Sequence, residues 1–261
     1  MAARAKPVVV RIALVSDVHG NVLALDAVLH EARRDGIDAV WCLGDLVAHG
    51  PRPVEVVARL REAEGLVCVR GNTDRYVVTG DLSGMIPPID QPQSPEEFGV
   101  LADARESFAW TRGCLVGGGD IAWLDGLPLQ HRLTLPDGTR VLLVHAAPGR
   151  DDGPGLRLAG SDAELAAAGF VNAESDLVLV GHTHVPGERR VADCHVVNPG
   201  SVSLPRTSDD RARWAVLEAT TAGYTVEHRT TRYELGRVLE DLVGQRHPAA
   251  EWLTSKMTSR T

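Results

Sequence analysis

The sequence predicts an α/β protein whose sheet is mainly parallel. Two observations lead to this fold class. In the first third of the chain, short apolar segments alternate with segments of helical period, which is typical of strand–helix units in a parallel sheet. The first apolar segment is also nearly continuous, as expected of a strand that is buried on both faces.

The first strand is expected over residues 8–16, where almost every residue is apolar and many are β-branched. Asn21 then fits the N-cap position of a helix. The helix should end near Asp35-Gly36, because apolar residues recur up to that point at i, i+3, i+4 and i+7. These inward-facing residues are Leu25, Val28, Leu29 and Ala32.

The same alternation continues through the next 30 residues or so of the chain. A second strand is expected over residues 39–43 and a third over residues 66–69. Between them, residues 53–64 predict a helix. Its inward face is expected to carry Val54, Val57 and Ala58.

A different pattern begins after the third strand. Residues 81–95 hold four prolines and predict a loop. The sequence Ser94-Pro95-Glu96-Glu97 has the form of a capping box with proline at the first helical position. It predicts a helix to about Trp110, with Leu101, Ala104 and Phe108 facing inward. This helical insertion, at about residues 81–118, fits a lid over a site and fits a plain structural insertion equally well.

The second half of the chain returns to strands. A hairpin is expected around Pro136-Asp137-Gly138, between strands over residues 131–135 and 139–144. Ser161 and Glu164 match a second capping box. Further strands are expected over residues 176–180, 194–197, 213–219 and 224–228.

The C-terminal part, at about residues 233–261, predicts one helix and a polar tail. The helix is indicated by apolar residues at helical spacing, namely Leu235, Val238, Leu239 and Leu242. The chain contains no internal repeat and no linker-like segment. We therefore expect a single domain over residues 1–261.

Composition limits the classes of function. The formal net charge of -8 argues against binding of bulk nucleic acid or of an anionic membrane. The four cysteines form no Cys-x-x-Cys pair, which favours buried thiols in a reducing compartment. No apolar segment is long enough for a secretory signal or a membrane span. A cytoplasmic protein is expected, and no particular oligomeric state is indicated.

Five polar segments follow expected strands directly. Because the carboxyl ends of parallel strands lie along one edge of a sheet, these segments should converge there. They contain two aspartates, one asparagine and four histidines that could act as ligands. In chain order the segments are Asp17-Val18-His19-Gly20-Asn21, Gly44-Asp45, Gly71-Asn72-Thr73-Asp74, Val144-His145-Ala146 and Gly181-His182-Thr183-His184.

Oxygen and imidazole donors without thiolates suit divalent Mn, Fe, Co, Ni or Zn. Seven such donors exceed what one tetrahedral ion requires, so the sequence predicts two ions, with Mn favoured. Each segment alone is weak evidence. An Asp-x-His after a strand is more often ordinary loop polarity, and His182-Thr183-His184 could be a surface pair. The ordered set of five is what indicates a metal centre.

In this order, the five segments resemble the calcineurin-like metallophosphoesterase superfamily, and most closely its compact bacterial phosphodiesterase branch. The resemblance runs from about residue 11 to residue 206 and includes Asn198-Pro199-Gly200-Ser201-Val202 and Leu204-Pro205-Arg206. It implies a two-sheet β-sandwich flanked by helices, an αββα arrangement. It also implies a site for two divalent ions that hydrolyses a small phosphate ester.

The resemblance also implies roles for single residues. Asp17, His19 and His184 would hold one ion. Asn72, His145 and His182 would hold the other, with Asn72 counted among the catalytic residues as well. Asp45 would bridge both ions. Many members of the superfamily have histidine where this chain has Thr73, and a threonine hydroxyl is too weak an acid to protonate a leaving group.

Two further residues are candidates for contact with the substrate. His49 could replace the missing acid, although a solvent-exposed loop histidine is the more ordinary interpretation. Arg206 could bind phosphate, as Thr73 could, but a surface ion pair fits Arg206 equally well. A phosphodiesterase is the favoured function. The alternatives are a phosphomonoesterase acting on a nucleotide or phosphoprotein, and a non-catalytic scaffold like the retromer subunit of the same superfamily.

Overall fold

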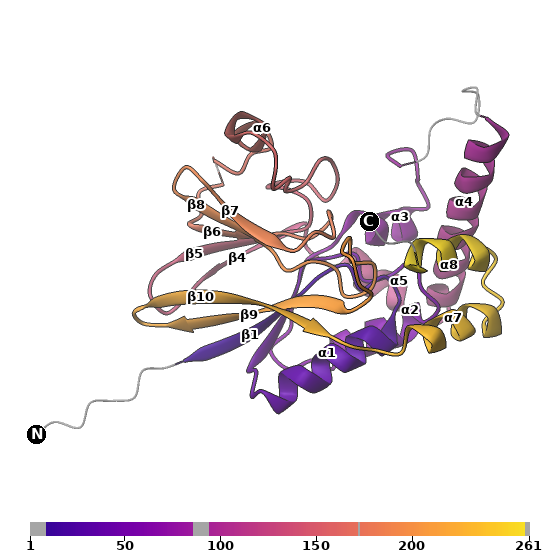
Figure 1. Ribbon diagram of the computed structural model, residues 1–261, viewed down its shortest axis with the longest axis horizontal. Coiled ribbons are helices and arrows are strands. Elements are labelled where there is room, and N and C mark those ends of the chain that lie inside the picture. Colours follow the sequence, from indigo (N-terminus) through magenta and orange to yellow (C-terminus); the bar gives the residue numbers. More distant parts are fainter. Residues whose placement is uncertain (1–8, 86–93, 172, 259–261) are drawn as a thin grey trace, which may run out of the picture.

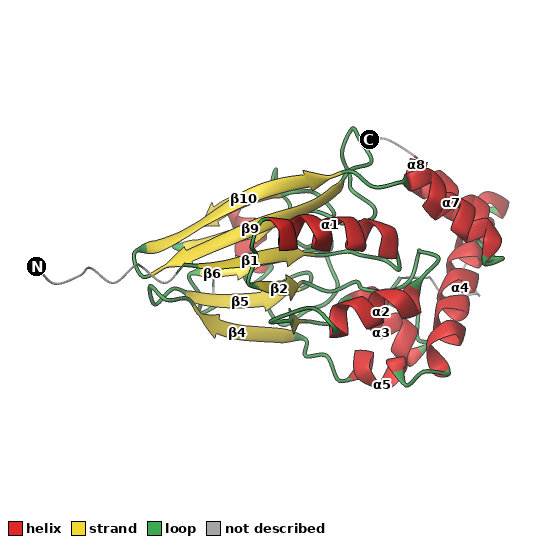
Figure 2. Ribbon diagram, turned by 90° about the horizontal axis from the view of Figure 1, so that it is seen from below, coloured by secondary structure: helices red, strands yellow, loops and turns green. Residues whose placement is uncertain are grey.

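The computed structural model describes residues 9–85, 94–171 and 173–258. Two five-stranded sheets pack face to face, and helices flank them (Figure 1). Most helices gather beyond one end of the strands, as the view in Figure 2 shows. The α/β fold class with a two-sheet sandwich is therefore confirmed. None of the described helices is long and apolar enough to cross a membrane.

The first sheet has the strand order β10-β9-β1-β2-β3. Its three strands from the N-terminal third are parallel to one another, whereas β9 pairs antiparallel with β1 on one side and with β10 on the other. The sheet is therefore mixed rather than mainly parallel. Its strands are β1 (Val10–Val15), β2 (Ala39–Cys42), β3 (Val67–Cys68), β9 (Ala212–Thr220) and β10 (Gly223–Thr231).

The second sheet is also mixed and has the order β4-β5-β6-β8-β7. The three inner strands are parallel, and the two outer strands pair antiparallel to their neighbours. Its strands are β4 (Gln130–Thr134), β5 (Arg140–Val144), β6 (Leu177–Leu179), β7 (Gly187–Val191) and β8 (Cys194–Asn198).

The position of β1 in the fold explains why its sequence is apolar throughout. Ile12 and Leu14 pack into the core between the two sheets, whereas Ala13 and Val15 pack on the helical side. Each fully buried aliphatic side chain contributes about 1.5–3 kcal/mol. Both faces of β1 are therefore stabilised by burial.

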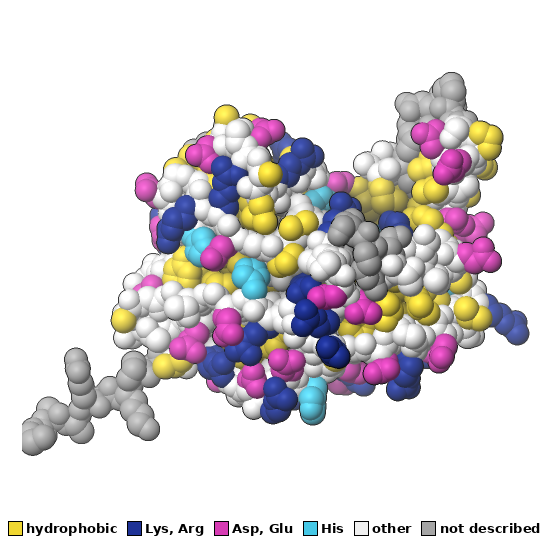
Figure 3. Space-filling view, viewed as in Figure 1, with side chains coloured by type: hydrophobic (Ala, Val, Ile, Leu, Met, Phe, Trp, Pro, Cys, Tyr) yellow, Lys and Arg dark blue, Asp and Glu magenta, His cyan; other side chains and the backbone are white. Residues whose placement is uncertain are grey.

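Eight helices are described. They are α1 (Val22–Arg34), α2 (Pro53–Arg61), α3 (Asn72–Thr79), α4 (Pro95–Val116), α5 (Asp120–Asp125), α6 (Asp162–Ala167), α7 (Leu235–Gly244) and α8 (Ala250–Thr258). The helix α1 covers the first sheet, and α4 projects from the body (Figure 1). A notch separates α4 from the lobe that contains α6 (Figure 3).

The helix signals of the sequence are confirmed where a cap or a long apolar stripe exists. The Asn21 side chain accepts from Ala24 N at 3.0 Å and caps α1, whose buried residues include all those expected. Both capping boxes form, at Ser94 and at Ser161. The helix opened by Ser94 runs further than expected, to Val116, because Thr111 and Leu115 extend its buried face.

The inward face of α2 was predicted wrongly. Val54 is 38% exposed and Ala58 is exposed, whereas Pro53, Val56, Val57 and Leu60 are buried. The helix begins at Pro53, and the buried set follows from that start at i, i+3, i+4 and i+7. The expected face was wrong because its pattern began at Val54, one residue after Pro53.

The prediction of a polar tail is also wrong over residues 250–258, because these residues form the helix α8. Leu253 and Met257 of α8 pack against Val238 and Leu242 of α7, and one turn of apolar spacing is too short a signal to detect. The strand β7 was not expected, because its outward residues are charged. Three expectations lie outside the described residues: the strand start at residue 8, the loop over residues 86–93, and the chain end at residues 259–261.

Candidate metal centre

The seven candidate ligands all lie in loops at the carboxyl ends of strands. Asp17 and His19 follow β1, Asp45 follows β2, and Asn72 begins α3 after β3. From the second sheet, His145 follows β5, and the remaining two, His182 and His184, follow β6. Five strand ends from two sheets therefore supply one cluster.

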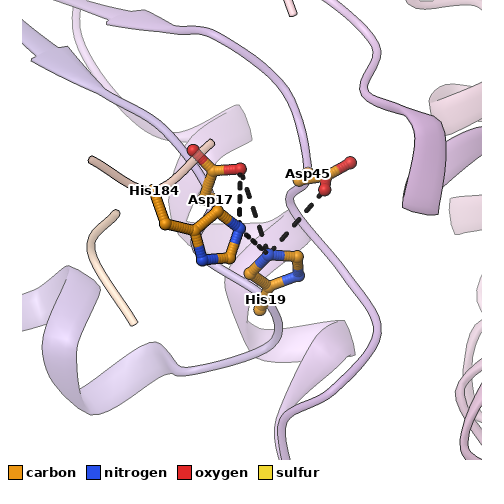
Figure 4. Close-up of side chains that lie close together, drawn as sticks. All are labelled: Asp17, His19, Asp45 and His184. Carbon is orange, nitrogen blue, oxygen red and sulfur yellow. Dashed lines mark hydrogen bonds and ion pairs between the residues drawn. The ribbon is translucent and has the colours of Figure 1, made fainter. Parts of the chain in front are cut away.

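Four of these residues form a compact group, shown in Figure 4. One ligand atom from each of Asp17, His19, Asp45 and His184 lies within 4.8 Å of the others. The Nε2 atoms of His19 and His184 are 3.2 Å apart, and His184 Nε2 lies 3.3 Å from Asp17 Oδ1. All four side chains point to one centre, as the ligands of a single ion would.

The other three form a second group beside it. Asn72 Oδ1 lies 3.1 Å from His145 Nε2 and 3.0 Å from His182 Nδ1. Asp45 Oδ2 stands between the groups, 3.3 Å from His145 Nε2 and 3.7 Å from His19 Nε2. The structure thus brings all seven candidates together, with one carboxylate adjoining both groups.

The electrostatics of this cluster fit bound cations. Burial alone would raise the pKa of Asp45, but the charge of His145 holds it well below its usual range. Burial alone would likewise lower the pKa of His145, but Asp45 and Asp17 raise it to about 10. Two fully buried carboxylates therefore demand positive charge close by, and a divalent ion supplies it more effectively than a proton.

Backbone carbonyls orient three of the four imidazoles. His145 Nδ1 donates to Leu43 O and His184 Nδ1 donates to Leu204 O, each at 2.7 Å. His182 Nε2 donates to Gly153 O, also at 2.7 Å. Since the nitrogen that donates to the carbonyl keeps its proton, the other nitrogen of each ring is the one left to bind a metal in the cluster. This tautomer is the one that binds a metal.

Comparison with known proteins settles the family. The sequence model of the calcineurin-like phosphoesterase superfamily domain matches residues 10–222. The chain belongs to this superfamily. Among curated relatives it is 26% identical over 205 residues to phosphodiesterase YfcE of Escherichia coli strain K12, covering 75% of this chain and 81% of YfcE.

Two other relatives match nearly the whole of this calcineurin-like phosphoesterase. The uncharacterized protein MJ0912 of Methanocaldococcus jannaschii is 28% identical over 264 residues, with 94% and 96% of the two chains covered. The crystal structure of a metallophosphoesterase from Sphaerobacter thermophilus has a TM-score of 0.68 at 28% identity, covering 95% and 98%. Hypothetical protein PH1004 from Pyrococcus horikoshii shares the fold, with a TM-score of 0.77 at 19% identity, covering 97% and 100%.

Asp74 is a supporting residue of the candidate metal centre to which the sequence analysis gave no role. Its fully buried carboxylate accepts from the backbone N–H groups of Leu46, Val47 and Gly71 at 2.9, 3.1 and 2.9 Å. It thereby joins the loop that carries Asp45 to the loop that carries Asn72. Burial, and then the charge of Asp45, raise the pKa of Asp74 to about 7. The signal was its place three residues after Gly71, as in a capping box.

Asn198 and Ser201 support the other side of the site. Asn198 Nδ2 donates to Gly181 O at 2.6 Å and to Thr183 Oγ1 at 3.0 Å, which holds the loop of His182 and His184. Ser201 Oγ donates to Asp17 O at 2.8 Å. The motif that begins at Asn198 was noticed in the sequence without a role, and these bonds supply one.

Two glycines are required by close approach of the loops. A Cβ atom at Gly71 would lie 2.1 Å from Asp45 Oδ1, and one at Gly181 would lie 1.9 Å from Ser16 Oγ. Neither distance is possible for real atoms without movement of the backbone. Side chains at these positions would therefore separate the ligand loops.

Thr73 lies inside the site, but its hydroxyl is already engaged. Its backbone N–H donates to Asp45 Oδ1 at 2.9 Å, and its Oγ1 donates to Val47 O at 3.1 Å. The side chain is 4% exposed. Thr73 thus positions the Asp45 carboxylate through its backbone, while its hydroxyl proton points to a carbonyl of the protein.

His49 is not an exposed loop residue, and that interpretation is wrong. It is 7% exposed, because its ring packs 5.3 Å from His19, 5.2 Å from Phe108 and 5.6 Å from Trp252, measured between centroids. Burial, and then the nearby His19, hold its pKa well below the usual value. Arg206 is exposed, and its backbone N–H donates to His184 O at 3.3 Å.

Proposed function

We propose that this calcineurin-like phosphoesterase hydrolyses phosphate diesters at a centre of two divalent metal ions. The observation that carries the proposal is the position of Asp45 Oδ2, 3.3 Å from His145 Nε2 on one side and 3.7 Å from His19 Nε2 on the other. A carboxylate that adjoins two groups of neutral donors is suited to bridge two cations.

The proposed ligands divide accordingly. Asp17, His19 and His184 hold the first ion, Asn72, His145 and His182 hold the second, and Asp45 bridges them. Manganese is the first choice, and Fe, Co, Ni or Zn would accept the same oxygen and imidazole donors. Asn72 contributes a neutral oxygen, so the second group adds no further anion beside the phosphate.

The two ions, when bound, would polarise the phosphoryl oxygens and lower the pKa of the attacking water. The chain supplies orientation. The carbonyls of Leu43, Leu204 and Gly153 keep the imidazole lone pairs directed inward, and Asp74 keeps the loops of Asp45 and Asn72 in register. Such preorganisation costs no rearrangement during the reaction.

Departure of the leaving group is the step for which this chain provides the fewest assisting side chains. The Thr73 hydroxyl donates to Val47 O, so it does not protonate a leaving alkoxide. We propose His49 and Arg206 as substrate contacts, since His49 Nδ1 has no hydrogen-bond partner among the described residues. Esters with acidic leaving groups should therefore react best, because a strongly basic alkoxide leaves slowly without protonation.

Preference for diesters is supported by the similarity to phosphodiesterase YfcE, and phosphomonoesters are the alternative substrate. The complete set of seven ligand side chains argues against a scaffold without activity.

Phe108 of α4 packs on His49, which supports the prediction that the segment over residues 81–118 shapes the pocket. We further propose that residues 1–261 form one domain.

The proposal is tested by metal content and hydrolysis together. Protein loaded with Mn should contain close to two ions per chain and cleave bis(4-nitrophenyl) phosphate. Asp45→Asn should impair both ions, whereas Asp137→Asn, in the β4–β5 turn, serves as a control and should change neither quantity. A stoichiometry of one that Asp45→Asn leaves unaltered would disprove the bridging role.

A further inference from the structure

The C-terminal helix α8 reaches the metal centre, although it lies outside the matched family region of residues 10–222. Its Trp252 ring packs 5.6 Å from the His49 ring, which in turn lies 5.3 Å from the ring of His19. The Lys256 ammonium sits over Trp252, 4.4 Å from the ring centroid. One cation–π contact and two contacts between rings thus connect Lys256 to a proposed metal ligand.

A second interaction fixes α8 in this place. The ring of Trp110 in α4 packs 4.4 Å from the ring of His247, in the turn between α7 and α8. Leu253 and Met257 of α8 are buried together with residues of α7. The helix that carries Lys256 is therefore docked on the rest of the protein rather than loosely attached.

Lys256 shares this side of the site with Arg206. Burial first, and then the charge of Arg206, lower the pKa of Lys256. Arg206 is attached to the centre through its backbone bond to His184 O. Two cations from different elements, a loop and a helix, are therefore each connected to the cluster by a contact of their own, Arg206 through this backbone bond and Lys256 through the aromatic rings.

Neither cation has an acidic partner within ion-pair distance in the described ranges 9–85, 94–171 and 173–258. Other arginines near the site are neutralised. Arg75 bonds to Asp151, and Arg52 bonds to Asp241 and to Glu55. Like charges repel, so two cations that interact with each other and have no acidic partner are each destabilised. A bound anion would remove this repulsion.

We propose that Lys256 and Arg206 form an anion subsite that binds a second phosphate group of the substrate, apart from the phosphate at the metal ions. The inference rests on the proposed function and narrows it to phosphate diesters whose organic part carries a further phosphate. Ammonium and guanidinium groups are the usual protein partners of phosphate oxygens. The connection to the metal centre through the His49 and Trp252 rings places the subsite beside that centre rather than within it.

Two esters with the same leaving group test the proposal. Thymidine 5′-(4-nitrophenyl phosphate) and its 3′-phosphorylated counterpart share the scissile diester and differ only in the second phosphate. The Mn-loaded enzyme should favour the 3′-phosphorylated ester by about tenfold in kcat/KM, the effect of one charge-assisted hydrogen bond. Lys256→Gln should bring this ratio close to one while leaving kcat/KM for the 3′-hydroxyl ester within about twofold. Arg206→Gln should lower the ratio as well.

Arg237→Gln is the matched control, because Arg237 is an exposed cation of the neighbouring helix α7. It should keep the ratio of the wild-type protein. Equal losses on both esters in Lys256→Gln would overturn the proposal, since Lys256 would then serve the scissile phosphate or the fold. Equal rates of the wild-type enzyme on both esters would overturn it too.

A binding measurement separates this inference from the proposed function. If the wild-type protein cleaves neither ester with any of the metals, the proposed diesterase activity fails. Calorimetry with the Mn-loaded protein should still show tighter binding of thymidine 3′,5′-bisphosphate than of thymidine 5′-monophosphate. Lys256→Gln should abolish this difference, and a wild-type protein that binds both nucleotides equally would refute the subsite.

Discussion

Replacement of Asp74 tests whether the loops, rather than the ligands alone, build the centre. The Asp74 carboxylate accepts three backbone N–H groups, from Leu46, Val47 and Gly71. Asp74→Ala leaves all three donors buried without a partner. Asp74→Asn keeps Oδ1 for Leu46 and Val47 but turns an amide N–H toward the N–H of Gly71, so that one bond is lost.

The two substitutions should differ in size for this reason. A buried donor without a partner costs about 1–3 kcal/mol, so Asp74→Asn should lower the free energy of unfolding by that amount. Three such donors in Asp74→Ala would cost about 3–9 kcal/mol, comparable with the total stability of about 5–15 kcal/mol of a typical protein. For a chain of this size, 1 kcal/mol corresponds to about 2–4 °C in Tm.

Thermal unfolding and Mn titration together provide the assay. Asp74→Asn should show a Tm about 2–12 °C lower and weaker Mn binding, because the loops of Asp45 and Asn72 lose one connection. Asp74→Ala should be largely unfolded. Asp137→Asn alters an aspartate that also accepts a backbone N–H, from Thr139, but in a surface turn, and it should leave Mn binding unchanged. Wild-type stability and Mn affinity in Asp74→Ala would refute the reasoning.

Two other predictions follow from single contacts. Thr73→Val removes the bond to Val47 O and should lower the free energy of unfolding by about 1 kcal/mol. The steep dependence of kcat/KM on leaving-group pKa should persist, as a series of aryl and alkyl diesters would show. Burial lowers the pKa of His247 to about 4, so below about pH 6.5 only the unfolded chain gains a proton. The free energy of unfolding should therefore fall as the pH drops toward 4. His247→Asn removes this titrating group, so urea unfolding at pH 5 should show a pH-dependent loss about 1–2 kcal/mol smaller than that of the wild-type protein.

The sequence was a good guide wherever a local signal has one physical meaning. The side chain of Asn21 could be placed as a cap because it is followed by a long apolar stripe, and the structure forms that bond. The ligand segments could be expected to converge because they follow strand ends, and all seven side chains do so, although they come from two sheets rather than from one edge of a single sheet. In both cases the information is contained in a short stretch of chain.

The sequence was a poor guide where position depends on packing between distant elements. The environment of His49 is made by Phe108 of α4 and Trp252 of α8, and no spacing in the sequence brings these rings together. The engagement of the Thr73 hydroxyl with Val47 O is a similar case, since it joins two loops 26 residues apart. Burial and hydrogen bonding at such sites become visible only in three dimensions.

The backbone of the ligand loops explains how the chain organises the centre by itself. Five of the ligand residues have positive φ. This backbone conformation costs a residue with a side chain about 1 kcal/mol or more. The five residues are Asp17 (55°), His19 (49°), Asp45 (54°), His182 (68°) and His184 (61°).

Bonds between loops hold this geometry. Asp17 N donates to Gly44 O and His19 N donates to Asp45 O, each at 3.0 Å, so the first two ligand loops fix each other's backbone. The strain is therefore carried by hydrogen bonds of the protein and by the buried strand β1 beneath them. Because these bonds run between backbone atoms, the donors converge through the fold itself, and ligand substitutions such as Asp45→Asn should change metal binding far more than they change the arrangement of the loops.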